Sequence, residues 1–320
     1  MLSSILETPS KEDISSSHEL IRSFIHRTPI LTSHTLNRIA GCDLYFKCEN
    51  FQKIGAFKMR GATNAVARLS QEELKNGVAT HSSGNHAAAL ALAAKEFGTK
   101  AYIVMPRNAP QVKKNAVAGY GAEIIECDPN LAARESNLET VVKQTGAKFI
   151  HPFDNYSVIA GQATAAKELI EDGPFFDFII APVGGGGLLS GTALACSFYS
   201  NHTKVIGSEP EGANDAFQSF NANKLIPVTN PKTIADGLLT SLSEKTFDII
   251  QKHVYAIYTV NDDEIRTAMR LIWERMKIII EPSCAVPFAA VLKNKEWFEG
   301  KKVGIILSGG NVDLDQFRFT

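Results

Sequence analysis

A lysine in the segment Gly55–Gly61 (GAFKMRG) is the residue of this chain best suited to covalent chemistry. The segment follows a strand-like run at residues 44–48 and opens a helical pattern at 59–69, so Lys58 is expected at a strand-to-helix turn. Its neighbours are small enough to leave the primary amine uncrowded, and such an amine can form Schiff bases or act as a base. A lone lysine is more often a solvated surface residue, so the remaining motifs must decide between these interpretations.

A run of four glycines, Gly184 to Gly187, follows an apolar strand at residues 178–183 and precedes a helix that opens at Leu188. Bare backbone N–H groups beside a helix N-terminus favour a bound phosphate. The alternatives are a flexible turn or a close-packed corner between strand and helix. The run lacks the Lys-Ser/Thr pair of a P-loop and the spacing of a dinucleotide fingerprint, which favours a small phosphate ester over a nucleoside triphosphate.

Two polar turns follow other strand-like segments. The hydroxyls, amide and N–H groups of residues 82–86 (SSGNH) could bind a carboxylate or a phenolic oxygen, although Ser83 or Asn85 could simply cap a helix. Residues 308–311 (SGGN) end the last strand, where Ser308 could hydrogen-bond a heterocyclic nitrogen or merely belong to a glycine-rich turn. One lysine amine, one phosphate cradle and two polar turns together indicate a pyridoxal phosphate enzyme.

Other residue patterns narrow the choice. An acidic loop at residues 209–215 could bind a hard cation through its oxygen atoms, or it could be an ordinary surface turn. The eight histidines show no zinc-ligand spacing, and no G-x-S-x-G sequence is present. A zinc enzyme and a serine hydrolase of that type are therefore disfavoured.

The composition is that of a water-soluble globular protein. The 320 residues are 44% hydrophobic and 21% charged, and the net charge of −1 does not favour nucleic-acid or membrane binding. The five cysteines form no C-x-x-C pair and are expected to be reduced thiols. Residues 1–18 lack the apolar core of a signal peptide, and no apolar run reaches the roughly 18 residues that span a membrane. We expect a cytoplasmic protein.

Strand-like and helical segments alternate along most of the chain, which predicts an α/β fold with parallel sheets. Strands are expected at residues 30–32, 44–48, 78–80, 101–104, 122–125, 149–150, 178–181, 204–208, 256–260 and 303–307. Helices are expected from Ser10 to Thr28 and at 59–69, 87–97, 111–118, 131–144, 156–171, 188–198, 262–276 and 284–292, with a loop-rich stretch at 211–238. We predict a small domain at 76–153 inserted in a large cofactor-binding domain formed by 1–75 and 154–320, with ligands at the carboxyl ends of the strands.

Taken in order, these motifs resemble the fold-type II pyridoxal phosphate enzymes and, within them, the serine racemase and serine/threonine dehydratase family. The similarity covers nearly the whole chain and includes residues 26–29 (HRTP), 47–50 (KCEN) and 235–237 (ADG). It implies the fold of tryptophan synthase β, with two three-layer α/β/α domains, twisted and mostly parallel sheets, and the cofactor in the cleft between them.

The resemblance also implies a role for each motif. Lys58 would form the Schiff base with pyridoxal phosphate and act as the base on one face of the substrate, and Ser83 would be the second base on the opposite face. The implied cofactor contacts are Phe57, Lys58, Asn85, Gly184, Gly185, Gly186, Gly187, Leu188, Gly237 and Ser308. The implied substrate contacts are Ser82, Ser83, Gly84, Asn85, His86 and, for a second carboxylate, Arg134.

Three functions follow as hypotheses. The first is a serine racemase that is also an L-serine and L-threonine ammonia-lyase, in which the α-proton leaves and either the β-hydroxyl follows or a proton returns on the opposite face. The second is a threo-3-hydroxyaspartate dehydratase of the same family. The third, from a different class, is a non-catalytic sensor that binds small anions. The neutral Ser308 beside the pyridine nitrogen would favour elimination over transamination.

Accessory sites are implied by the same resemblance. Glu209, the carbonyl of Ala213 and Asp215 match a divalent-cation site, so Mg²⁺ is expected, and the protein is expected to be a homodimer. The residues that match a nucleotide site are Lys53, Lys113, Tyr120, Glu281 and Asn311. His34, Ala88 and Phe153 depart from the pattern of the mammalian-type racemase, which weighs against activation by ATP.

Overall fold

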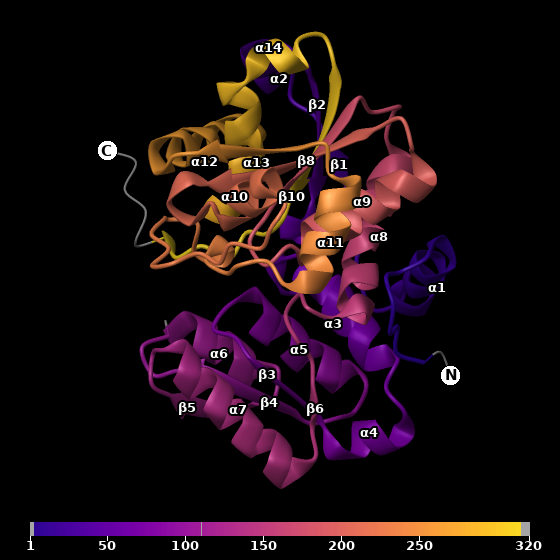
Figure 1. Ribbon diagram of the computed structural model, residues 1–320, viewed down its shortest axis with the longest axis vertical. Coiled ribbons are helices and arrows are strands. Elements are labelled where there is room, and N and C mark those ends of the chain that lie inside the picture. Colours follow the sequence, from indigo (N-terminus) through magenta and orange to yellow (C-terminus); the bar gives the residue numbers. More distant parts are fainter. Residues whose placement is uncertain (1–2, 110, 315–320) are drawn as a thin grey trace.

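Two mainly parallel sheets organise the chain, and helices cover both faces of each (Figure 1). The computed structural model describes residues 3–109 and 111–314. The larger sheet has the order β1-β2-β10-β7-β8-β9, and only β1 runs antiparallel to its neighbour. Its strands are β1 (Ile30–Leu31), β2 (Asp43–Cys48), β7 (Phe178–Pro182), β8 (Lys204–Pro210), β9 (Ala256–Val260) and β10 (Lys302–Leu307).

The smaller sheet has the order β5-β4-β3-β6 and is entirely parallel. Its strands are β3 (Val78–His81), β4 (Ala101–Pro106), β5 (Glu123–Cys127) and β6 (Lys148–Phe149). The helices α5 (Asn85–Glu96) and α6 (Gln111–Gly119) cover one face, and α7 (Leu131–Thr145) covers the other. These elements fall within the predicted small domain, whose boundaries remain a prediction.

Helices from both ends of the sequence cover the larger sheet. One face packs against α1 (Lys11–Ile21), α8 (Tyr156–Asp172), α9 (Gly187–Tyr199) and α11 (Glu244–His253), and the other against α2 (His34–Ala40), α12 (Asp262–Met276) and α13 (Pro282–Lys293). The remaining helices are α3 (Lys58–Ala67), α4 (Gln71–Asn76), α10 (Asp215–Ala222) and α14 (Lys295–Phe298). Short 3₁₀ turns are η1 (Glu49–Phe51), η2 (Lys53–Gly55), η3 (Glu211–Ala213) and η4 (Asp236–Leu238).

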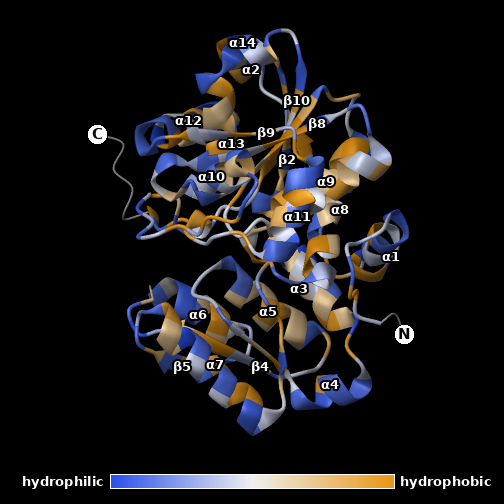
Figure 2. Ribbon diagram, in the orientation of Figure 1, coloured by the Kyte–Doolittle hydropathy of each residue, from blue (hydrophilic) through white to orange (hydrophobic). Residues whose placement is uncertain are grey.

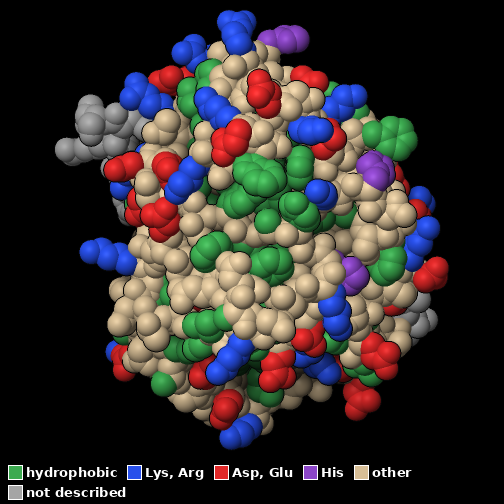
Figure 3. Space-filling view, turned by 45° about the horizontal axis from the view of Figure 1, so that its top comes forward, with side chains coloured by type: hydrophobic (Ala, Val, Ile, Leu, Met, Phe, Trp, Pro, Cys, Tyr) green, Lys and Arg blue, Asp and Glu red, His purple; other side chains and the backbone are tan. Residues whose placement is uncertain are grey.

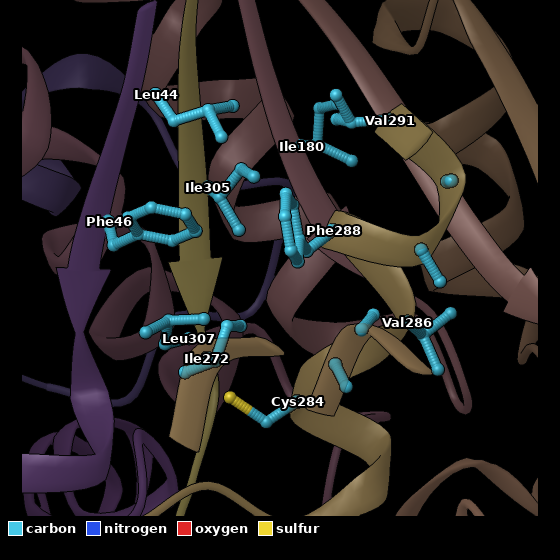
Figure 4. Close-up of a cluster of buried hydrophobic side chains, with 14 of the residues drawn as sticks. Leu44, Phe46, Ile180, Ile272, Cys284, Val286, Phe288, Val291, Ile305 and Leu307 are labelled. Atoms are coloured by element: carbon cyan, nitrogen blue, oxygen red, sulfur yellow. The ribbon is translucent and has the colours of Figure 1, made fainter. Parts of the chain in front are cut away.

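The core of the larger sheet is packed from alternating strand residues and one helix face (Figure 4). Phe46 of β2 and Phe288 of α13 are fully buried and meet edge to face, with ring centroids 5.9 Å apart. Burial of each such side chain contributes about 1.5–3 kcal/mol. The colouring of Figure 2 shows this separation, with apolar strands inside and polar outer surfaces on helices such as α12.

The predicted cap of the first helix is confirmed, because Ser10 and Asp13 form a capping box. The predicted end is wrong: α1 stops at Ile21, and Phe24 and Ile25 lie beyond it. The stretch predicted to be loop-rich also contains the helix α10.

Helix α3 is fixed by an unusually close approach to α8. A Cβ atom added to Gly161 would lie only 2.6 Å from the backbone oxygen of Arg60 and 2.7 Å from the Cα of Gly61. Only glycine allows the two helix backbones to come this near. The helix that begins with Lys58 is therefore held firmly against α8.

The surface carries charges of both signs. Figure 3 shows acidic and basic side chains interspersed on one face, in keeping with the net charge of −1. Within the described residues, no helix combines the length and the hydropathy needed to cross a bilayer.

Candidate active site

The lysine turn, residues 55–61, is joined by backbone hydrogen bonds to the turn that follows β10. The N–H of Phe57 donates to the backbone carbonyl of Ser308 at 3.0 Å, and the N–H of Gly310 donates to the backbone carbonyl of Gly55 at 2.9 Å. Gly55 adopts a φ of +72°, which favours glycine. Two motifs that lie about 250 residues apart in the sequence thus form one structure, with Lys58 at the start of α3.

The Lys58 amine is half-buried and donates a hydrogen bond to the Pro152 carbonyl at 2.9 Å. It lies 5.2 Å from the centroid of the Phe57 ring. Burial lowers the pKa of Lys58 to about 8, because the charged amine loses hydration. A large fraction of the amine is therefore neutral near pH 8, as both a nucleophile and a base require.

The glycine run follows β7, and its last residue, Gly187, begins α9. The run and Leu188, in the first turn of α9, are buried. A Cβ atom on Gly185 would lie 2.3 Å from the ring of Phe153, and Gly186 has a φ of +87°. Gly186 caps α9 without any side-chain hydrogen bond. Because Gly186 offers no side-chain acceptor to the first N–H groups of α9, these groups suit a phosphate.

The polar turn between β3 and α5 contacts the larger sheet through Asn85. Its Nδ2 donates to Glu281 at 2.9 Å, and its Oδ1 accepts from Asn311 at 2.9 Å. Burial, and then the charge of Asp236, raise the pKa of Glu281 to about 8. In the same turn Ser82 Oγ accepts from the Gly84 N–H at 3.3 Å, and Ser83 is half-buried.

Two contributors were missed by the sequence predictions. The hydroxyl of the buried Ser283 accepts from the N–H of Gly237 at 3.0 Å and so fixes the backbone expected to lie along the cofactor ring. The Pro152 carbonyl is the acceptor for Lys58. Because any residue has a carbonyl, no side-chain pattern could have indicated Pro152.

Arg134 lies in the first turn of α7, at the carboxyl end of the smaller sheet. Its Nε is buried and has no hydrogen-bond partner in the structure. Burial lowers the pKa of His81; the charge of Glu135 opposes this shift and that of Arg134 adds to it. His81 ends β3 directly before the polar turn, so the charge of Arg134 acts on the strand that leads into the predicted substrate contacts.

Comparison with known proteins identifies the family. The model of the pyridoxal-phosphate dependent enzyme family matches residues 21–309. The chain belongs to this family. It is 52% identical over 308 residues to the beta-hydroxyaspartate dehydratase of Paracoccus denitrificans, a match that covers 96% of this chain and 98% of that protein. It is also 52% identical to the serine racemase of Dictyostelium discoideum, covering 97% of each.

A solved structure agrees with these relatives. Maize serine racemase superposes with a TM-score of 0.95 at 43% identity, covering 97% of this chain and 95% of that one. The predicted fold-type II architecture, the enzyme class and the family of serine racemases and hydroxy-amino-acid dehydratases are thereby confirmed. The glycine cradle and the partly neutral Lys58 amine fit pyridoxal phosphate, since one suits its phosphate and the other its aldehyde.

Glu209 and Asp215, the predicted cation ligands of this pyridoxal-phosphate dependent enzyme, form a buried acidic pair. Glu209 accepts from the N–H groups of Ala216 and Phe217 at 3.0 and 2.8 Å. Asp215 Oδ2 accepts from the Leu242 N–H at 3.2 Å, whereas Oδ1 is buried without a partner. Burial raises the pKa of both groups, to about 9 for Glu209 and about 6 for Asp215.

No salt bridge joins this acidic pair to a cation within residues 3–109 and 111–314. The same residues contain no group of three or more His, Cys, Asp or Glu side chains that could hold a metal. A cation would therefore need the Ala213 carbonyl, and water, in addition to the two carboxylates. Ala213 is buried in η3, between the two acids in the sequence.

The five predicted nucleotide contacts come from segments far apart in the sequence, and Asn311 Nδ2 donates to the carbonyl of Ile54, beside Lys53, at 2.7 Å. Glu281 and Asn311 meet at Asn85, as described above. Lys53 pairs with Glu96 at 3.6 Å, and Lys113 pairs with Asp236 at 2.7 Å. Tyr120 lines a surface hollow together with Ala91 and Lys95. A nucleotide would have to compete with the acidic partners of both lysines.

Proposed function

We propose that this enzyme racemises serine and dehydrates L-serine and L-threonine to keto acids and ammonia. The observation that carries the proposal is the Lys58 amine, which is half-buried, bonded to a carbonyl and shifted to a pKa of about 8. Support comes from the relatives at 52% identity, one named a serine racemase and the other a hydroxyaspartate dehydratase. Both names denote reactions that begin by breaking the bond between Cα and its hydrogen.

Lys58 supplies the first base. When bound, pyridoxal phosphate provides an electron sink for the negative charge that forms at the substrate Cα. The neutral amine of Lys58 takes the α-proton, and its hydrogen bond to the Pro152 carbonyl orients the amine. Water loss at Cβ then gives, after hydrolysis, a keto acid and ammonia.

Ser83 supplies the second acid–base group. Racemisation needs a proton donor on the face opposite Lys58, whereas elimination needs only one base. Ser83 lies in the turn after β3 of the smaller sheet, while Lys58 begins α3 next to Phe57, whose N–H bonds to the turn after β10 of the larger sheet. This origin from two different sheets supports the assignment of opposite faces.

The other predicted contacts bind and orient. Gly184 to Gly187 would hold the phosphate, Gly237 would lie along the ring, and Ser308 would meet the pyridine nitrogen as a neutral partner. Phe57 would pack near the ring, and Asn85 would meet the phenolic oxygen while Glu281 and Asn311 hold the amide in place.

The test separates the two bases. Purified Lys58→Ala should lose the visible absorption of bound cofactor and both activities. Ser83→Ala should keep the absorption and the deamination of L-serine but lose racemisation by at least about 100-fold, the contribution expected of a general acid–base group. A colourless wild-type protein, or equal loss of both activities in Ser83→Ala, would contradict the proposal.

A second candidate substrate is threo-3-hydroxyaspartate. The observation in its favour is the unpartnered Nε of Arg134, because a guanidinium binds carboxylates in a fork-like geometry. Arg134→Ala should reduce kcat/KM for hydroxyaspartate by about 10- to 100-fold while leaving serine turnover within about twofold, and Arg134→Lys should restore part of the loss. Equal effects on both substrates would remove this candidate.

We also propose that Mg²⁺ binds to Glu209, Asp215 and the Ala213 carbonyl, and that the protein is a cytoplasmic homodimer. The orphaned Asp215 Oδ1 supports the cation.

The exposed apolar residues Phe51 and Ile279 support a dimer interface, since Asn50 bonds to the Ile279 carbonyl at 3.1 Å and brings the two segments together. The five free, buried cysteines suit a reducing compartment. Analytical ultracentrifugation with and without Mg²⁺ tests the assembly.

A further inference from the structure

We infer that His86 is a positioning residue for Lys58, because its ring fixes the segment whose Pro152 carbonyl accepts the lysine amine. The inference rests on the assignment of Lys58 as the reactive amine in the proposed function, but on no particular substrate. It gives the His86 side chain a task different from binding the substrate carboxylate.

The hydrogen bond of His86 defines its tautomer. The residue lies in the first turn of α5, is 2% exposed, and its Nε2 lies 3.1 Å from the Ile150 oxygen. A carbonyl oxygen only accepts, so Nε2 carries the hydrogen and Nδ1 presents a lone pair. Nδ1 is buried and has no partner in the structure. Burial, followed by the nearby charge of Lys58, lowers the pKa of His86 to about 3, so the ring stays neutral.

The segment that His86 holds is short and rigid. The N–H of Ile150 donates to the Ala79 oxygen at 2.9 Å, so this residue is anchored to β3 on one side and to His86 on the other. His151 Nδ1 then accepts from the N–H groups of Phe153 and Asp154, at 3.3 and 2.8 Å. These bonds close a tight turn around Pro152.

The same turn contacts both halves of the candidate site. The Pro152 carbonyl accepts from Lys58 Nζ at 2.9 Å, and the Phe153 ring fills the space where a side chain at Gly185 would lie. A shift of the turn would therefore move the acceptor for Lys58 together with the wall of the phosphate cradle.

Positioning matters here because a lysine side chain has four rotatable bonds and an amine with no fixed direction. A hydrogen bond donated to a fixed carbonyl restricts the amine while leaving its lone pair able to accept a proton. Misplacement of a reacting group by about 1 Å can reduce the rate about 100-fold. A purely structural role for His86 would instead lower stability without changing the reactivity of Lys58.

Three substitutions at His86 separate these roles. His86→Leu removes the donor, His86→Gln offers an amide N–H near the position of Nε2, and His86→Asn is too short to reach it. The matched control is Thr203→Val, which also removes a buried bond from a side chain to a backbone carbonyl, in this case that of Phe176 at 2.8 Å. Thr203 lies directly before β8, far from His86 in the sequence.

The main measurement needs no substrate. Cofactor is removed and pyridoxal phosphate is added back, so that the Lys58 amine condenses with the aldehyde and water is lost. Borohydride then reduces the resulting bond, and mass spectrometry quantifies the labelled protein over time and pH. We expect the rate of cofactor attachment to Lys58 and kcat to fall by about 10- to 100-fold in His86→Leu and His86→Asn. Both should recover largely in His86→Gln. KM and the unfolding temperature should change no more than in Thr203→Val.

Two outcomes would overturn the inference. One is attachment at the wild-type rate in His86→Leu, or in His86→Asn if the leucine variant fails to fold. The other is a loss in His86→Gln equal to that in His86→Asn. Because attachment is measured without substrate, a wrong assignment of the serine and threonine activities would leave this result unchanged.

Discussion

Two buried acidic clusters in this enzyme have the same burial, but only one of them contains positively charged side chains that pair with its acids. In the first, Glu49 and Glu168 are at most 1% exposed and lie against Arg60 and Lys47, which are fully buried. In the second, Glu209 and Asp215 are equally buried but face only backbone N–H groups. The comparison separates a cluster whose charges are paired within the described residues from the one at which we propose a bound cation.

The first cluster is neutral and almost fully hydrogen-bonded. Arg60 bonds to Glu49 at 2.7 and 2.8 Å and to Glu168 at 2.8 Å through two nitrogens. Lys47 Nζ bonds to Glu168 at 2.6 Å and to the Thr28 carbonyl at 2.7 Å. Burial alone would raise the pKa of Glu168, but hydrogen bonds from His18 and Arg60 and the nearby positive charges hold it well below its usual range. Such a network locks β2, α3 and α8 together behind Lys58.

The second cluster has two carboxylates and no side-chain cation within the described residues. Without a counter-ion, burial favours the protonated carboxyl groups, in line with the raised pKa values of Glu209 and Asp215, and a bound cation would instead favour their ionised forms. The difference between the clusters therefore predicts two opposite changes in stability. Removing a positively charged side chain should destabilise the protein through the first cluster, whereas adding a metal cation should stabilise it through the second.

The largest expected effect is on the first cluster. Arg60→Met leaves two buried carboxylates with Lys47 as their one remaining lysine or arginine partner, and loss of one partner of a buried ion pair costs about 3–5 kcal/mol. Urea unfolding should show this loss, or the variant should accumulate as insoluble protein. The control is Arg270→Met, which removes an exposed helical pair with Glu274 and should cost less than about 1 kcal/mol. Similar unfolding free energies for the two variants would contradict the comparison.

An intermediate effect is expected from Mg²⁺ at the second cluster. A ligand at 100 times its Kd stabilises the folded state by about 2.7 kcal/mol, so chelation by EDTA should lower the unfolding temperature of the wild type and Mg²⁺ should restore it. Asp215→Asn should abolish this response. Glu211→Gln, which changes an exposed acid of the same loop that pairs with Lys293, should retain it. A full response in Asp215→Asn would place the cation elsewhere.

The two clusters also show how far the sequence could predict this structure. Local signals indicated the lysine turn, the glycine run and the capping box of α1, since each depends on neighbouring residues. Pairing of Glu168 with Arg60 joins residues 108 positions apart, which only the packing of α3 on α8 brings together. The predicted start of α5 at Ala87 was also late, because Asn85 and His86 are polar and interrupt the apolar pattern although they begin the helix.

Helix α10 was missed for a related physical reason. Helix α10 has eight residues and begins at Asp215, one of the predicted cation ligands, so its first turn appeared to be an acidic loop. The Pro152 acceptor is a backbone atom, and the bond from His86 to Ile150 spans 64 residues. Motifs made of neighbouring residues could be recognised in the sequence, whereas contacts made by a single backbone atom or by distant packing required the structure.

The smallest expected effect is the acid dependence of the first cluster. A carboxylate whose pKa is depressed on folding stabilises the protein above its unfolded pKa, about 4.3 for glutamate, and this contribution is lost as the pH falls toward the folded pKa. In that window the unfolded state binds one more proton at Glu168, so the free energy of unfolding should fall by about 1.4 kcal/mol per pH unit from this group. Urea unfolding between pH 2.5 and 5 should show a shallower decline in Glu168→Gln, although that variant is less stable at pH 7. Equal slopes in the two proteins would mean that Glu168 is not the carboxylate through which acid weakens the network.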